Sequence, residues 1–199
     1  MKLFVYVHGR GGSAEDAGRY GALFPESHVI GFDYRSDKPW EAGMEFPVFF
    51  RGCRSGYDSV SVIAESIGAF LAMSSLDASL VDRAYLISPV VSMEKLILGM
   101  MRHDGISEKE LSERHEILAE SGEMLSWEYL CYVRDNPIQW NVPSSILYGE
   151  NDDLTSYDDI LAFAAEAGAE LTVMKGGEHW FHTESELDFL DRWLIRSAM

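Results

Sequence analysis

The chain has 199 residues, of which 47% are hydrophobic, and this length and composition suit one domain, 1–199, with a single sizeable core. The 33 acidic residues outnumber the 16 Lys and Arg residues, so the formal net charge is −17. This balance argues against binding nucleic acid, whose phosphates need a positive surface, and against docking on anionic membranes.

No apolar run approaches the ~20 residues of a membrane span. The apolar stretch 3–7 is short, and no cleavage site follows it, so it resembles a first core strand more than a signal peptide. Cys53 and Cys131 lack metal-ligand spacing and suggest no disulfide framework. We therefore expect a cytoplasmic protein with reduced thiols, no metal and no cofactor, and no feature of the sequence indicates its oligomeric state.

Strands and helices alternate along most of the chain. Short apolar runs predict strands at 3–7, 27–32, 60–64, 84–88, 145–148 and 171–174. Helical patterns predict helices at 67–75, 157–167 and 184–197, and the last one carries its leucines on one stripe. The last helix begins with Thr183 and Glu186 at the spacing of a capping box. This alternation predicts an α/β fold, a three-layer α/β/α sandwich around a mostly parallel sheet of about six strands.

The stretch 93–141 interrupts the alternation. It is rich in Met and aromatic residues and reads as mostly helical. It is too long for a simple connection, so we expect a helical insertion within the single domain. Two interpretations stay open at this point, which are a cap that covers a site as a lid, and extra helices packed on the edge of the sheet.

A serine lies between a predicted strand and a predicted helix, in the sequence Ala64-Glu65-Ser66-Ile67-Gly68. A nucleophile on a sharp strand-to-helix turn has the pattern G-x-S-x-G, because the turn leaves room only for small neighbours. Here Ala64 replaces the first glycine. The motif alone is weak, since a polar turn between a strand and a helix explains it equally well.

A glycine-rich turn, His8-Gly9-Arg10-Gly11-Gly12-Ser13, follows the first predicted strand. Backbone N–H groups in such a turn can approach a negative oxygen. A phosphate-binding loop is the rival interpretation, but the turn lacks the Lys-Ser/Thr ending of a P-loop and the G-x-G-x-x-G spacing of a dinucleotide site. The third interpretation is an ordinary turn with no binding role.

Two later turns also carry side chains suited to catalysis. Asp152 follows the strand 145–148, and His179 follows the strand 171–174 on a glycine turn. Open α/β sheets build their sites at these carboxyl ends of strands. Asp153 and His182 are the alternatives to Asp152 and His179. The order Ser, then Asp, then His is the one expected of an α/β-hydrolase.

Four segments together resemble the α/β-hydrolase superfamily, and they are VYVHGRGGS, VIAESIGA, ILYGENDDLT and GGEHWFH. The resemblance covers nearly the whole chain and implies a small form of the fold, with 93–141 in the place of the family's cap and without the family's first two strands. It also implies a serine-hydrolase mechanism. The catalytic groups would be Ser66, Asp152 and His179, and the backbone N–H groups of Arg10 and Ile67 would form the oxyanion hole.

The expected activity is cleavage of a carboxylic ester of a small acyl substrate, with no nucleic acid or membrane as partner. The same three groups would also serve a thioesterase, a peptidase or an acyltransferase, and a non-catalytic hydrolase-like binding module is a further alternative. Glu65, beside the serine, either bonds a lid residue or faces solvent. The aromatic side chains of Trp180 and Phe181 line an acyl pocket or belong to the core.

Overall fold

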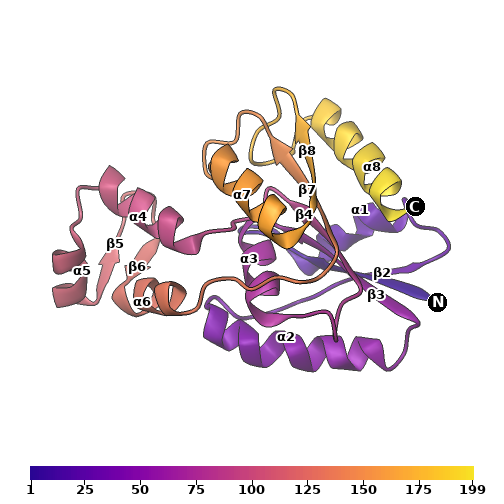
Figure 1. Ribbon diagram of the computed structural model, residues 1–199, viewed down its shortest axis with the longest axis horizontal. Helices are drawn as coiled ribbons and strands as arrows, with labels where there is room; N and C mark the ends of the chain where they lie inside the picture. Colours follow the sequence, from indigo (N-terminus) through magenta and orange to yellow (C-terminus); the bar gives the residue numbers. More distant parts are fainter. The chain divides into compact units, whose positions relative to one another are not determined.

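The computed structural model describes residues 1–199, whose contacts group them into a larger unit, Met1–Val91 with Gln139–Met199, and a smaller unit, Ser92–Ile138. The larger unit is built on a six-stranded sheet in the order β2-β1-β3-β4-β7-β8, and every strand pair is parallel (Figure 1). Its strands are β1 (Lys2–Val7), β2 (His28–Gly31), β3 (Ser59–Glu65), β4 (Arg83–Ile87), β7 (Ser144–Gly149) and β8 (Glu170–Met174). Each lies within one residue of its predicted ends, so the predicted fold class is confirmed.

Helices cover both faces of this sheet (Figure 1). One face carries α2 (Pro39–Arg54), α3 (Ser66–Ser75) and α7 (Tyr157–Ala167). The other carries the short η1 (Ala14–Ala17) and α1 (Gly18–Gly21) together with α8 (Glu184–Ala198). The three predicted helices are present, and α8 begins with the predicted capping box, in which Thr183 Oγ1 accepts the N–H of Glu186.

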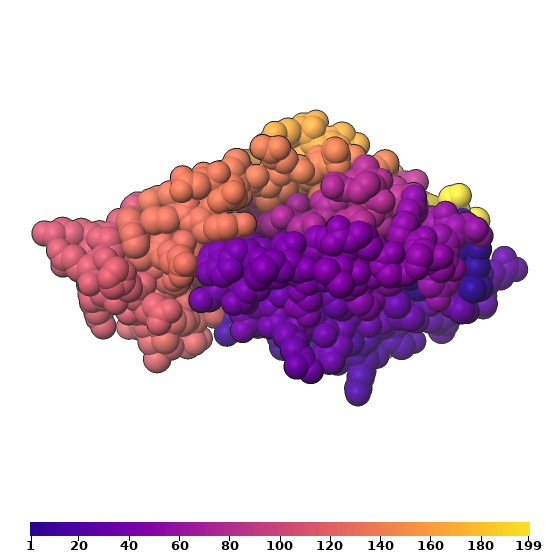
Figure 2. Space-filling model, turned by 90° about the horizontal axis from the view of Figure 1, so that it is seen from below, coloured from indigo at the N-terminus to yellow at the C-terminus, as the bar shows by residue number.

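The sequence does not predict α2, because Pro47 lies inside it and removes an N–H donor from the helix ladder. The helix forms nevertheless, since Pro39 occupies its first turn, where proline suits the backbone, and Phe46 and Phe50 are fully buried. Its opposite side lies at the surface of the larger unit (Figure 2). Met44 and Val48 are exposed there.

The two faces of the sheet receive alternate side chains of each strand. Tyr6 of β1 and Ile63 of β3 are register partners and point toward α1 and α8, where they join one core cluster with Tyr20, Leu190 and Trp193. Glu65 lies two residues beyond Ile63 on the same strand. It therefore faces the same side, at the carboxyl end of the sheet.

The smaller unit contains α4 (Met93–His103), α5 (Glu108–Arg114) and α6 (Trp127–Asp135), with an antiparallel hairpin of β5 (Glu116–Leu118) and β6 (Met124–Ser126). The three helices make up most of this unit, as expected, and the hairpin is an element that the sequence did not predict, because strands this short show no readable alternation. Arg134 of α6 binds both other helices of this unit. Its Nε lies 2.6 Å from Oε1 of Glu94 in α4, and its Nη1 lies 2.7 Å from Oε2 of Glu108 in α5. The predicted insertion, 93–141, overlaps this unit, and its role as a cap stays a prediction.

None of the helices combines the length and the apolar character needed to cross a lipid bilayer.

Candidate active site

Ser66 is the first residue of α3 and directly follows the last residue of β3. Its φ angle is +49°, in the left-handed region that a residue with a Cβ atom rarely adopts. Strained backbone of this kind is characteristic of functional turns, and here it presents the hydroxyl at the tip of the turn. Ile67 follows in the first helical turn, where N–H groups have no partner within the helix.

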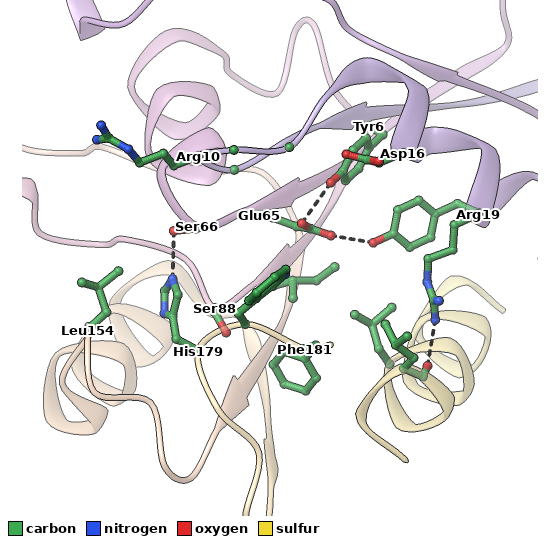
Figure 3. A pocket seen from close by; sticks show the side chains of 18 of the residues that line it. Tyr6, Arg10, Asp16, Arg19, Glu65, Ser66, Ser88, Leu154, His179 and Phe181 are labelled. Atoms are coloured by element: carbon green, nitrogen blue, oxygen red, sulfur yellow. Dashed lines mark hydrogen bonds between the residues drawn. The ribbon is translucent and has the colours of Figure 1, made fainter. Parts of the chain in front are cut away.

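Ser66, His179 and Asp152 form a continuous chain of hydrogen bonds. Ser66 Oγ lies 2.9 Å from His179 Nε2 (Figure 3), and His179 Nδ1 lies 2.7 Å from Asp152 Oδ2. The three residues come from the ends of β3, β8 and β7, because parallel strands bring their carboxyl ends to one edge of the sheet. The contacts assign one ring nitrogen of His179 to each neighbour, which is the arrangement a general base needs.

Asp152 is held as an ionised hydrogen-bond acceptor. Its side chain is fully buried. Oδ1 accepts the N–H groups of Leu154 and Thr155 at 2.9 and 2.8 Å, and Oδ2 accepts the Thr155 hydroxyl at 2.9 Å. Burial raises the pKa of Asp152, but the hydrogen bonds from His179 and Thr155 outweigh it, so the pKa lies below its usual value. The alternative, Asp153, is exposed, and Asp152 is the carboxylate in contact with His179.

The loop that carries His179 is fixed by Glu186 of α8. This carboxylate is only 4% exposed and accepts the N–H groups of Glu178, His182 and Thr183. Burial raises the pKa of Glu186, but these hydrogen bonds and the Thr183 hydroxyl lower it to about 2. His182, the alternative base, is exposed and stacks on Trp180 with ring centroids 5.0 Å apart.

Close approach of two glycines brings the Asp152 and His179 loops together. A Cβ atom at Gly149 would lie 2.4 Å from the carbonyl oxygen of Glu178 and 2.5 Å from that of Gly177. Only glycine fits there without moving backbone. A hydrogen bond also joins the two loops, because the N–H of Asn151 donates to the carbonyl of Gly177 at 2.7 Å.

The glycine-rich turn after β1 passes directly beside Ser66. A Cβ atom at Gly9 would lie 3.2 Å from the Cβ of Ser66. The N–H of Gly12 donates to the carbonyl of Gly9 at 3.2 Å and tightens the turn. Figure 3 shows Arg10 on this turn, beside Ser66, with its side chain directed away from Glu65. The two backbone segments expected to bind an oxyanion, at Arg10 and Ile67, therefore flank the same hydroxyl.

No family model matches the chain, and no curated protein matches its sequence. Solved structures do. Est1E from Butyrivibrio proteoclasticus superposes with a TM-score of 0.73 at 15% identity, over 99% of this chain and 88% of that one. Mouse alpha/beta hydrolase domain-containing protein 10 superposes with a TM-score of 0.74 at 13% identity, over 98% of this chain and 89% of that one. An alpha-beta serine hydrolase homologue from Coxiella burnetii superposes with a TM-score of 0.62 at 15% identity, over 100% of this chain and 85% of that one.

The chain has the α/β-hydrolase fold. At these identities the likeness concerns the course of the backbone, so the chemistry of the site depends on this chain's own side chains.

A cavity of about 880 Å³ opens beside Ser66 in this α/β-hydrolase fold. It extends from Ser66 and His179 toward the face of the sheet that α1 and α8 cover (Figure 3). Its walls include apolar side chains, which are Ile87, Leu154, Trp180, Phe181, Leu187 and Leu190. Phe181 also belongs to the core, whereas Trp180 is 74% exposed at the cavity's edge.

Polar groups also face the cavity, and among them is Glu65, whose position differs from the one expected from the sequence. Its Oε2 accepts the Tyr6 hydroxyl at 2.9 Å and its Oε1 accepts the Tyr20 hydroxyl at 2.6 Å (Figure 3). Burial raises the pKa of Glu65, the two hydrogen bonds oppose this rise, and the net shift is upward. The expectation of a lid contact or a solvent-facing carboxylate was wrong. The alternation along β3, which puts Glu65 on the side of Ile63, is the signal that could have placed it.

Residues with metal-ligand spacing occur only in the smaller unit, where atoms of His103, Asp104 and Glu120 lie within 4.8 Å of one another. This group is largely exposed, and Asp104 Oδ2 already accepts the N–H of Glu120 at 2.7 Å. The cluster is therefore explained as a turn contact, and the cavity beside Ser66 is built without such a group.

Proposed function

We propose that the chain is a serine hydrolase that cleaves a carboxylic ester of a small acyl substrate. The observation that carries this proposal is the chain of contacts from Ser66 Oγ to His179 Nε2 at 2.9 Å and from His179 Nδ1 to Asp152 Oδ2 at 2.7 Å. The cavity of about 880 Å³ beside Ser66 lies in the range of small-molecule sites. A small acyl ester in the cytoplasm, rather than a nucleic acid or a membrane surface, is the proposed partner.

The reaction begins when Ser66 Oγ attacks the ester carbonyl carbon while its proton passes to His179 Nε2. Asp152 accepts the Nδ1–H of His179 and stabilises the imidazolium that forms. The carbonyl oxygen becomes an oxyanion, which the backbone N–H groups of Arg10 and Ile67 bind. Ile67 adds the favourable end of the α3 dipole.

Collapse of this intermediate expels the alcohol, which takes the proton from His179, and leaves an acyl group on Ser66 Oγ. A water molecule then gives a proton to His179 and attacks the acyl carbonyl. The Ser66 oxygen leaves, regains its proton from His179, and the carboxylic acid departs. Acylation and deacylation each return His179 and Asp152 to their starting states.

Labelling with a fluorophosphonate probe tests the nucleophile. We expect covalent labelling of the wild type and of Ser13→Ala, whose serine is exposed on the glycine-rich turn, and loss of labelling in Ser66→Ala. Thermal melts establish that each variant is folded. Labelling that persists in Ser66→Ala would exclude Ser66 as nucleophile, and absence of labelling in the wild type would favour a non-catalytic binding module.

A second measurement identifies the bond that is cleaved. Oxygen esters, thioesters, anilides and an added alcohol acceptor are compared as substrates of the wild type. The proposal requires the highest kcat/KM for the oxygen ester of a short acyl chain. A preference for one of the others would reassign the same three groups to thioesterase, peptidase or acyltransferase activity.

A further inference from the structure

The proposed oxyanion donor, the N–H of Arg10, belongs to a peptide group whose carbonyl is held in place. That carbonyl is the one of Gly9, and in a planar trans peptide the C=O and the N–H point in opposite directions. The Gly9 oxygen accepts the N–H of Gly12 at 3.2 Å and lies 2.9 Å from His8 Nδ1. These two contacts therefore set the direction of the Arg10 N–H.

The imidazole of His8 serves here as a hydrogen-bond donor. A carbonyl oxygen can only accept, so the contact with Gly9 places a proton on Nδ1 of His8. Two donors on one carbonyl also polarise its peptide group, which strengthens the N–H on the other side as a donor. Because His8 and Gly9 are adjacent in the chain, the contact depends on the orientation of the imidazole ring, and that orientation has to be fixed from elsewhere.

Tyr34, in the loop between β2 and α2, holds His8 at two points. Its ring stacks on the imidazole, with centroids 4.4 Å apart and an angle of 18° between the planes. Its hydroxyl donates to the carbonyl oxygen of His8 at 2.7 Å. This is the carbonyl against which Gly68 packs. Tyr34 thus fixes both the side chain of His8 and the peptide group that follows it.

The loop that presents Tyr34 is itself anchored on α2. Glu45 of that helix accepts the N–H of Ser36 at 3.1 Å. The ring of Tyr34 packs against Phe46, which is fully buried, with centroids 5.3 Å apart. Burial and the charges of Asp37 and Glu45 raise the pKa of Tyr34 to about 12, so its hydroxyl stays protonated at neutral pH and keeps its role as a donor.

We infer that Tyr34 and His8 are positioning residues of the oxyanion hole. Tyr34 orients the ring of His8, and this ring orients the peptide group that carries the Arg10 N–H. Donors that are oriented before the reaction stabilise the transition state without any rearrangement. Neither side chain lines the cavity, so both act through the backbone rather than by contact with the substrate. The inference deepens the proposed esterase function and depends on it.

Replacement of the carbonyl oxygen of the ester by sulfur isolates this effect. Sulfur is a weak hydrogen-bond acceptor, so a thionoester gains little from the N–H donors, whereas an oxygen ester gains from both. The two substrates are methyl butanoate and O-methyl thionobutanoate, and the rate of methanol release gives kcat/KM for each. Their ratio reports on the oxyanion hole, because a general loss of activity lowers both values and leaves the ratio unchanged.

In Tyr34→Phe, which removes only the hydroxyl, we expect kcat/KM for the oxygen ester and the ratio to fall together by about 3- to 10-fold. In His8→Ala both should fall further, by up to about 100-fold, because loss of an oxyanion donor costs about 10²- to 10³-fold. The matched control is Tyr57→Phe. It removes a hydroxyl that lies 2.8 Å from a histidine outside the cavity, and it should keep both wild-type values.

A binding measurement without turnover checks the same point. Propylboronic acid forms a tetrahedral adduct with the nucleophile and places an oxygen in the oxyanion hole, whereas butanoate, the reaction product, forms no such adduct. The inhibition constant of the boronic acid should rise in Tyr34→Phe by the factor lost in kcat/KM, and that of butanoate should stay at the wild-type value. Equal changes for both inhibitors would indicate a distorted cavity and overturn the inference.

The other failures are also distinct. A ratio that stays at the wild-type value in both variants would overturn the positioning role and leave the esterase proposal standing. A fall in His8→Ala alone would remove Tyr34 from the role, and a fall in Tyr34→Phe alone would remove the ring of His8. A wild type that hydrolyses neither ester and shows no labelling of Ser66 would reject the esterase proposal itself. Thermal melts establish that each variant is folded.

Discussion

Gly68 lies so close to the carbonyl oxygen of His8 that a Cβ atom at position 68 would be 2.1 Å from it. His8 directly follows β1, and Gly68 is in the first turn of α3. This contact sets the start of α3 against the glycine-rich turn. It thereby brings Ser66 beside this turn, where a Cβ atom at Gly9 would lie 3.2 Å from the Cβ of Ser66.

Gly68→Ala should therefore damage both the fold and the activity. The obstacle is backbone, which cannot turn aside as a side chain does, so we expect a loss of about 1–3 kcal/mol in the free energy of unfolding and a reduced kcat. Urea denaturation and ester hydrolysis measure the two effects. Gly52→Ala, in α2 with open space around the added methyl group, serves as control and should be neutral or slightly stabilising. Equal behaviour of both variants would contradict the steric argument.

Replacement of Asp152 by Asn should lower kcat by about 10⁴-fold, because the amide no longer holds His179 in the required tautomer. Asp153→Asn should leave kcat near the wild-type value, since Asp153 is exposed and Asp152 holds the contact with His179. Steady-state hydrolysis of one ester by both variants makes the comparison. A larger loss in Asp153→Asn would reverse the assignment.

The two histidines should differ in the same way. His179→Ala removes the proposed general base and should lower kcat by several orders of magnitude. His182→Ala removes an exposed ring that stacks on Trp180, so we expect a change of only a few-fold. Comparable losses in both variants would show that the loop, rather than the base, limits the reaction.

Glu186 should make stability depend on acid pH. Its pKa falls from 4.5 to about 2 on folding, so the stabilisation is fully present above pH 4.5 and is lost as the pH falls toward 2. Wild type and Glu186→Gln should therefore differ most in free energy of unfolding at neutral pH and converge on acidification. Urea denaturation from pH 7 to pH 2.5 measures this, and Glu170→Gln, which removes an exposed carboxylate on β8, is the matched control. A difference that stays constant with pH would exclude this linkage.

Much of the fold could be predicted because its signals are local. Near-continuous apolar runs such as the one in β1 mark strands buried on both faces, and the capping pair Thr183 and Glu186 marks the start of α8. The prediction of helices and strands failed where tertiary packing overrides a local signal, or where an element is too short to give one. Pro47 concealed α2, and the three-residue strands β5 and β6 were too short to show a pattern.

By itself the sequence determined the type and order of the strands, and with them the order in which Ser66, Asp152 and His179 occur at strand ends. It left Asp153 and His182 as alternatives, because neighbours in sequence share the same local pattern. Only the tertiary structure decided which side chains meet, since the distances depend on backbone approaches at Gly149 and Gly68. It also decided the position of Glu65. A charge that reads as a surface residue in the sequence lies on the cavity wall, because the alternation of β3 turns it toward Tyr6 and Tyr20.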